Sequence, residues 1–197
     1  MRGRTSRQHV KEEEGKETAR LVLRKFTLGD APALAAYRSD PEVSRYQSWE
    51  SPVSTEEAER LAVTLSAGDP RDPGWFQYAV ERRDVPGLIG DVGVRRSEDG
   101  RQAELGFTLA RAFQGCGYAT EAVARVVKFL LADEGLHRVS AACDGRNVRS
   151  AGLLERVGFR REGHLVQSTW IKGEWTDDIL FGLLASEYRA SSATGRP

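Results

Sequence analysis

Residues 114–122 have the composition and spacing of a phosphate-binding loop. They follow a run of strand-forming residues at 103–109 and open a stretch whose apolar spacing predicts a helix. Glycines just before a helix let backbone N–H groups surround an anion, and the helix N-terminus adds partial positive charge. The segment therefore predicts a phosphate cradle made of backbone groups. The alternative is that Gly115 and Gly117 only form a turn.

Two common phosphate loops fit the segment poorly. A dinucleotide-binding loop carries a third glycine or alanine where Thr120 stands, and an acidic residue about 20 positions later at a strand end. A nucleoside-triphosphate loop ends in Gly-Lys-Ser or Gly-Lys-Thr, which this segment lacks. The nature of the phosphate therefore depends on the rest of the chain.

Composition narrows the classes of partner. The 197 residues carry 29 Lys and Arg against 29 Asp and Glu, so no basic excess favours nucleic acid or an anionic membrane. No apolar run is long enough to span a bilayer, and the charged N-terminus lacks a signal-peptide core, so we expect a cytoplasmic protein. Two cysteines and three scattered histidines offer no metal-ligand spacing, so no metal is expected. The excess of arginine over lysine is typical of a GC-rich bacterial genome.

Hydrophobic patterns predict the elements that position the cradle. A helix over 119–130 carries an apolar stripe of period 3.6 and ends at Gly135. Short loops between consecutive strands favour an antiparallel meander, and the strand at 138–143 completes a β-α-β unit. Further predicted strands lie at 20–26, 76–80, 88–94 and 104–109, with a final hairpin of 159–170 and 175–184 turning at Lys172-Gly173. A shorter helix is predicted at 31–37, with Asp30 as its cap, and another at 150–157. A third helix is predicted to begin at the capping box formed by Ser54 and Glu57.

The ends of the chain differ from its middle. Residues 1–18 are polar without apolar periodicity, and we expect a disordered tail. Residues 189–197 are rich in Ser, Ala and Gly, which predicts a loose C-terminal tail. The remaining residues, 19–188, predict a single domain.

The sequence closely resembles the GNAT N-acetyltransferases. Their acetyl-CoA motif, Gln/Arg-x-x-Gly-x-Gly/Ala, falls on Gln114, Gly117 and Ala119. The stretch from Asn147 to Gly163 is similar to the RimJ/RimL-type branch, which includes acetyltransferases of ribosomal-protein N-termini. The resemblance spans 20–188 and implies an α/β GNAT fold. That fold has a mixed, mostly antiparallel central sheet, flanked by helices and splayed at the acetyl-CoA site.

The resemblance also implies which residues bind the donor, acetyl-CoA. Backbone amides of the loop and helix start would bind its pyrophosphate, and the preceding strand would pair with its pantetheine chain and supply an oxyanion N–H near Leu109. Asn147 and Ser150 would contact CoA, and the alternative for Asn147 is that it only caps a helix or forms a turn. Arg111, Arg146 and Arg149 could contact phosphates or be solvated surface charges. The backbone set is Phe107, Thr108, Leu109, Gln114, Gly115, Cys116, Gly117, Tyr118, Ala119 and Thr120.

Catalytic candidates come from the same resemblance. Many GNAT enzymes place a tyrosine acid where Leu154 stands here, and a ribosomal-type relative places a glutamate base where Thr169 stands. The RimJ/RimL-type branch instead implies Ser150 as proton donor, although a helix N-cap is its alternative role. Glu104, on the strand leading into the site, is the candidate general base or a structural carboxylate.

We therefore expect an N-acetyltransferase that moves acetyl from the co-substrate acetyl-CoA to a primary amine by direct attack in a ternary complex. The acceptor would be a protein N-terminus or a small-molecule amine, and a longer acyl donor and a homodimer stay open. The alternative is a catalytically weakened CoA-binding module, which Leu154 and Thr169 favour. Three aromatic side chains could line an acceptor pocket or belong to the core, namely Trp49, Trp75 and Trp170.

Overall fold

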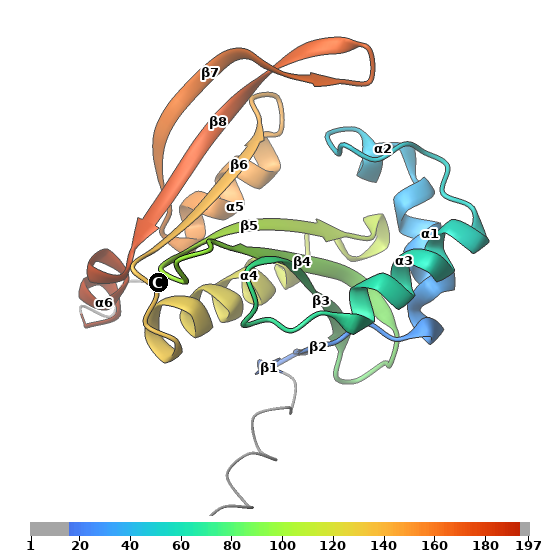
Figure 1. The fold of residues 1–197 in the computed structure, drawn as a ribbon, viewed down its shortest axis with the longest axis horizontal. Helices are drawn as coiled ribbons and strands as arrows, with labels where there is room; N and C mark the ends of the chain where they lie inside the picture. The colour runs from blue at the N-terminus through green and yellow to red at the C-terminus, as the bar shows by residue number, and fades with distance from the viewer. Residues whose placement is uncertain (1–15, 194–197) are drawn as a thin grey trace, which may run out of the picture.

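The central feature of the fold is one twisted sheet with the strand order β1-β2-β3-β4-β5-β6-β8-β7 (Figure 1). The structure, a computed structural model, describes residues 16–193, so predictions for 1–15 and 194–197 lie outside the described residues. Its strands are β1 (Lys16–Glu17), β2 (Leu21–Arg24), β3 (Gly74–Arg82), β4 (Leu88–Arg96), β5 (Gln102–Leu109), β6 (Arg138–Asp144), β7 (Arg160–Ile171) and β8 (Glu174–Leu184). Its α-helices are α1 (Ala31–Ser39), α2 (Pro41–Ser44), α3 (Thr55–Ala67), α4 (Tyr118–Lys128), α5 (Val148–Val157) and α6 (Ala185–Ala193).

Strand pairing follows the predicted topology. Each neighbouring pair among β2, β3, β4 and β5 is antiparallel. Short turns join β3 to β4 and β4 to β5, as expected for antiparallel neighbours, whereas residues 25–73, with α1, α2 and α3, connect β2 to β3. β5 and β6 pair in parallel because α4 carries the chain back across the sheet between them. β8 lies between β6 and β7 and is antiparallel to both. The mixed, mostly antiparallel sheet, the β-α-β unit and the final hairpin are thus confirmed.

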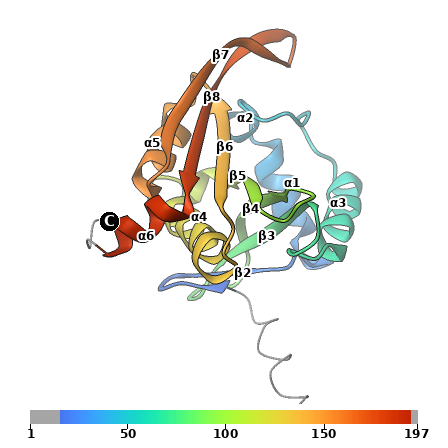
Figure 2. The same cartoon turned by 60° about the vertical axis from the view of Figure 1, so that its left-hand side comes forward.

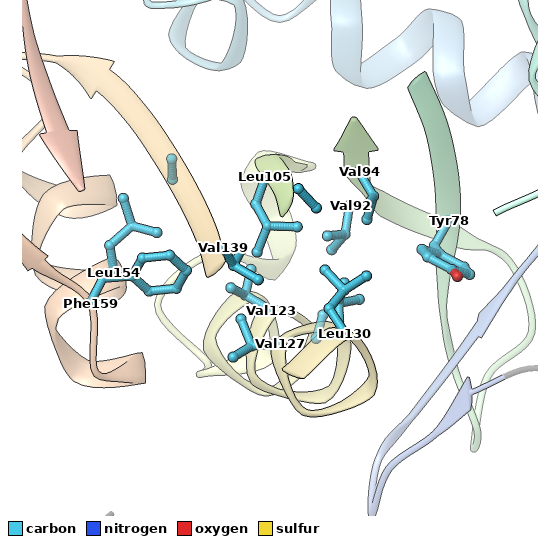
Figure 3. Close-up of a cluster of buried hydrophobic side chains, with 14 of the residues drawn as sticks. Tyr78, Val92, Val94, Leu105, Val123, Val127, Leu130, Val139, Leu154 and Phe159 are labelled. Carbon is cyan, nitrogen blue, oxygen red and sulfur yellow. The ribbon is translucent and has the colours of Figure 1, made fainter. Parts of the chain in front are cut away.

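Two apolar clusters hold helices to the two faces of the sheet. The larger cluster joins the apolar stripe of α4, with Val123 and Val127 fully buried, to β4, β5 and β6 (Figure 3). Figure 2 shows α4 and α5 on one side of the strands and α1 and α3 on the other. The smaller cluster packs α1 and α3 against Ala79 and Leu88. Burying such side chains stabilises the fold by about 1.5–3 kcal/mol each.

Element boundaries differ from the predictions in several places. Lys16–Glu17 pairs with β2, so strand structure begins within the predicted N-terminal tail, and α6 extends through residues 189–193 of the predicted C-terminal tail. Asp30 does not cap α1 with its side chain. It accepts a hydrogen bond from Thr27 at 2.8 Å and pairs with Arg24 instead, which fixes the turn before α1. Among residues 16–193, no helix is long and apolar enough to cross a membrane.

Candidate functional site

The loop between β5 and α4 has the backbone geometry of an anion cradle. Gly115 and Gly117 have φ angles of 78° and 80°, in the left-handed region that other residues rarely adopt. The side-chain Nε2 of Gln114 donates a hydrogen bond to the carbonyl oxygen of Leu109 at 2.9 Å. This bond ties the start of the loop to the end of β5. Residues 114–117 are exposed, so a ligand can reach their backbone.

The N-terminus of α4 is not capped by a side chain. Gly117 is its N-cap residue and has no side chain that could accept from the first N–H groups. The carbonyl oxygen of Gly117 accepts the first helical hydrogen bond, from the N–H of Glu121 at 3.0 Å. The preceding N–H groups, those of Tyr118, Ala119 and Thr120, belong to the unsatisfied first turn of a helix. Such groups and the helix dipole together favour an anion at this end.

The parallel strands β5 and β6 separate beside this loop. Their pairing begins at Gln102 with Arg138 and ends at Leu105 with Ala141, although both strands continue further (Figure 1). On its other edge β5 stays paired with β4 as far as Leu109. Residues 106–109 therefore have backbone groups that face a gap rather than a strand. Phe107, Thr108 and Leu109 lie in this segment, and an extended ligand can pair with them by strand addition.

On the opposite side of the gap, Asn147 and Ser150 lie at the start of α5. The side-chain oxygen of Asn147 accepts a hydrogen bond from the N–H of Ser150 at 3.1 Å. Asn147 is thus the N-cap, and α5 begins two residues before the predicted start. The cap alternative for Ser150 is wrong, because Ser150 lies inside the first turn. Leu154, at the position of the tyrosine acid, is fully buried in the apolar core.

Glu104 lies on the face of β5 opposite the apolar residues that pack against α4. Its carboxylate pairs with Arg95, its register partner on β4. Glu104, Arg95 and Ser140 line a surface cavity of about 410 Å³. One third of the Glu104 side chain is exposed, so solvent and a ligand can both reach it. Glu104 is therefore accessible as an acid or base, but it is also held by an ion pair.

A buried carboxylate lies next to the gap, and the sequence analysis did not single it out. Asp91 on β4 pairs in register with Thr108 and is only 4% exposed. The hydroxyl of Tyr37 on α1 donates a hydrogen bond to this carboxylate. Burial raises the pKa of Asp91 above its ordinary value, and this outweighs Arg38 and the Tyr37 hydrogen bond, which lower it. Nothing in the local sequence around Asp91 reveals this pair, because its partner lies 54 residues away.

The tip of the β7–β8 hairpin contacts the end of α2. The Nζ of Lys172 donates a hydrogen bond to the carbonyl oxygen of Ser44 at 2.6 Å. Thr169, at the position of the glutamate base of a ribosomal-type relative, donates its hydroxyl to Asp178 at 2.5 Å. Figure 1 shows β7 and β8 extending beyond β6 toward the side of α2.

The arginines and tryptophans considered from the sequence have distinct surroundings. Arg146 forms ion pairs with Asp144 at 2.7 Å and Glu174 at 2.8 Å. Trp75 is 56% exposed and lies over Gly93, and Trp170 is 58% exposed. These two tryptophans are not core residues. Trp49 is half-buried and packs against the smaller apolar cluster. Arg111 and Arg149 are exposed.

Comparisons with known proteins agree with this geometry. A family model described as an acetyltransferase (GNAT) domain matches residues 20–160. YoaA of Bacillus subtilis, described as an uncharacterized N-acetyltransferase, is 33% identical over 169 residues, covering 85% of this chain and 95% of that protein. The ribosomal protein uS5-alanine N-acetyltransferase of Escherichia coli is 31% identical over 84 residues, covering 43% of each.

A solved structure extends the likeness to the fold. The spermidine N-acetyltransferase of Vibrio cholerae, in complex with CoA and spermine, is similar with a TM-score of 0.74 and 26% identity. The match covers 87% of this chain and 99% of that one. The family model spans well over half of the chain, and YoaA matches over 95% of its own length. The chain belongs to the GNAT family of N-acetyltransferases.

Proposed function

We propose that the protein transfers an acetyl group from acetyl-CoA to a primary amine, by direct attack of the amine in a ternary complex. The observation that carries this proposal is the separation of β5 and β6 beside the uncapped start of α4. The separated end of β5 offers backbone groups to an extended chain, and the start of α4 offers backbone amides to an anion. Acetyl-CoA combines an amide-containing arm with a pyrophosphate, so the chemistry of the two features fits it.

Binding at this site uses main-chain donors, which explains glycines without a lysine. Hydrogen bonds from N–H groups to ionised oxygens contribute about 1.5–3 kcal/mol each. We infer that residues 114–120 hold the pyrophosphate and that Phe107, Thr108 and Leu109 pair with the pantetheine arm. A backbone N–H near Leu109 then lies where it can stabilise an oxyanion. Bound acetyl-CoA supplies the thioester carbonyl that the amine attacks.

The chain must also remove and return protons. Only a neutral amine is nucleophilic, so an ammonium acceptor must lose a proton before attack. We assign Glu104 as the base that accepts it, directly or through water, because its carboxylate is reachable from the cavity on this face. Ser150 is the candidate donor to the departing thiolate, since capping of α5 is carried out by Asn147. A free thiol has a pKa of about 8.5, so the thiolate leaves readily and this donor contributes modestly.

The acceptor is a protein N-terminus or a small-molecule amine. The names of two relatives support both kinds, since one acetylates an alanine of ribosomal protein uS5 and another acetylates spermidine. Carboxylates occur on the face where the amine would enter, among them Glu104 and Asp178. These groups favour a cationic acceptor over an anionic one.

Thiol release with a panel of amines tests the proposal. Purified protein is mixed with acetyl-CoA and one amine at a time, including polyamines and short peptides with free N-termini, and free thiol is followed with a chromogenic disulfide. We expect amine-dependent thiol release with at least one acceptor, and mass spectrometry should find the acetylated amine. CoA binding without turnover on a broad panel would instead support a catalytically weakened CoA-binding module.

Substitution of Gly117 tests the cradle itself. Gly117→Asp places a β-carbon 3.4 Å from the Arg20 side chain and a negative charge beside the bound pyrophosphate. We expect calorimetry to detect no acetyl-CoA binding by this variant. Gly100→Asp is the matched control, because Gly100 has a similar φ of 65° with open space around it. Equal affinity of Gly117→Asp and the wild type would contradict the cradle assignment.

A further inference from the structure

Arg20, at the entry to β2, contacts the glycine-rich loop and the first turn of α4 at once. Its Nη1 donates a hydrogen bond to the carbonyl oxygen of Cys116 at 3.0 Å. Its Nε donates to Glu121 at 2.6 Å, and its backbone N–H donates to the same carboxylate at 3.0 Å. The guanidinium also lies 4.6 Å from the ring centroid of Tyr118. A single side chain thus joins three consecutive parts of the cradle.

The contact with Cys116 fixes the direction of a peptide group. In a trans peptide the C=O and the following N–H point in opposite directions. Because Arg20 binds the carbonyl oxygen of Cys116, the N–H of Gly117 points away from Arg20. Gly117 is conformationally permissive, and without this hydrogen bond the peptide could rotate its carbonyl oxygen toward an anion. The Arg20 contact therefore selects the peptide orientation that offers a donor.

The contact between Arg20 and Glu121 changes the net charge at the start of α4. Glu121 lies in the first turn of α4, where a carboxylate would repel a pyrophosphate bound to the same N-terminus. Partial burial would raise the pKa of Glu121, but hydrogen bonds from Thr18 and Arg20 outweigh it and lower the pKa, so the carboxylate is ionised at neutral pH. Thr18 contributes a hydroxyl donor at 2.6 Å. Arg20 supplies the positive charge that neutralises this carboxylate.

We propose that Arg20 is a positioning residue for the donor. It orients the Cys116–Gly117 peptide and neutralises Glu121, so that the loop accepts a pyrophosphate. The inference rests on the proposed function and adds to it a residue outside the glycine-rich motif. Arg20 acts through the loop, so its loss should weaken binding of ligands that carry the pyrophosphate and spare those that lack it.

Comparison of two donors tests this role. Wild type, Arg20→Ala and Arg20→Lys are assayed with acetyl-CoA and with acetylpantetheine, which lacks the pyrophosphate and nucleotide. We expect Arg20→Ala to raise the KM for acetyl-CoA about tenfold or more, with kcat changed less than about twofold. The kcat/KM for acetylpantetheine should stay within about twofold of the wild type. Arg20→Lys should be intermediate, because an ammonium keeps the charge but cannot contact Cys116 and Glu121 as a fork.

Two further variants separate the role from a general loss of structure. Arg161→Ala removes an exposed arginine that pairs with Glu155 on α5, and it should leave both donors unaffected. Adding Glu121→Gln to Arg20→Ala removes the negative charge that has lost its arginine partner, and it should recover part of the lost acetyl-CoA affinity. Equal losses on both donors, or no loss on either, would overturn the role of Arg20.

Binding measurements keep this test separate from the test of the enzyme activity. Calorimetry with CoA and with pantetheine gives the same donor comparison without turnover. If the wild type binds CoA but releases no thiol, the acetyl-transfer proposal fails while the ratio of the two dissociation constants still tests Arg20. If the wild type binds neither compound, both proposals are contradicted.

Discussion

The side-chain Oδ1 of Asn147 accepts a hydrogen bond from the backbone N–H of Ser150 at 3.1 Å. This contact makes Asn147 the N-cap of α5 and places Ser150 in its first turn. The residue that the resemblance associates with CoA thus has a structural role, whereas the serine is released from capping. Substitutions of Asn147 and Ser150 can therefore distinguish a structural role from a catalytic one.

Asn147→Ala should destabilise the protein. Loss of a capping side chain costs about 0.5–2 kcal/mol, because a first-turn N–H loses its partner. We expect a decrease of this size in the free energy of unfolding, measured by urea denaturation. Ser150→Ala is the matched variant and should change the free energy of unfolding by less. A larger loss for Ser150→Ala than for Asn147→Ala would contradict the assignment of the cap.

Ser150→Ala should lower kcat about tenfold while leaving the dissociation constant for acetyl-CoA unchanged. The reason is that Ser150 would act on the departing thiolate, which is a moderate leaving group even without help. Steady-state rates and calorimetry on the same preparation measure the two quantities. An unaltered kcat at several pH values would remove Ser150 from catalysis.

Glu104→Gln should lower kcat/KM and change its pH dependence. Without a carboxylate base, the rate should continue to rise with pH as the acceptor ammonium loses its proton to solvent. Arg95→Gln is the control, because it breaks the same ion pair but keeps the carboxylate. Rate profiles from pH 6 to 9 would compare the two variants. Matching profiles for Glu104→Gln and Arg95→Gln would show that the ion pair, and not a base, is what activity requires.

Local sequence was enough to predict the backbone geometry of the loop before α4. Gly115 and Gly117 precede an amphipathic helix, and both the left-handed backbone and the helix start follow from that order. The meander and the parallel β5–β6 pair could also be predicted, since loop length decides between antiparallel pairing and a crossover. The start of α5 could not be placed correctly, because Asn147 and Ser150 are both good cap residues.

Contacts between distant residues could not be predicted. Arg20 and Glu121 are separated by 101 positions, and neither has a neighbouring motif that names its partner. Tyr37 and Asp91 belong to a helix and a strand that meet only after the sheet has formed. Neither the Arg20–Glu121 pair nor the Tyr37–Asp91 pair has a local sequence pattern that indicates it. In both pairs the interaction depends on two distant segments that the fold brings together.

Asp91→Asn should stabilise the protein increasingly as pH rises. Burial raises the pKa of Asp91 in the folded state above its ordinary 3.8. Below that ordinary value the carboxyl is protonated in both states, and its contribution to stability is fully present. As pH rises toward the folded pKa, the unfolded chain ionises first, so the wild type loses stability. Asparagine cannot ionise and still accepts the hydrogen bond from Tyr37.

The measurement is the difference in unfolding free energy between Asp91→Asn and the wild type, from urea denaturation between pH 4 and 7. The difference should grow in favour of the variant and level off above the folded pKa of Asp91. Tyr37→Phe is the companion variant: it removes the donor that stabilises the ionised carboxylate, so its loss of stability should be greater at pH 7 than at pH 4. A difference for Asp91→Asn that stays constant with pH would mean that Asp91 does not titrate differently in the folded protein, and burial would not control its charge.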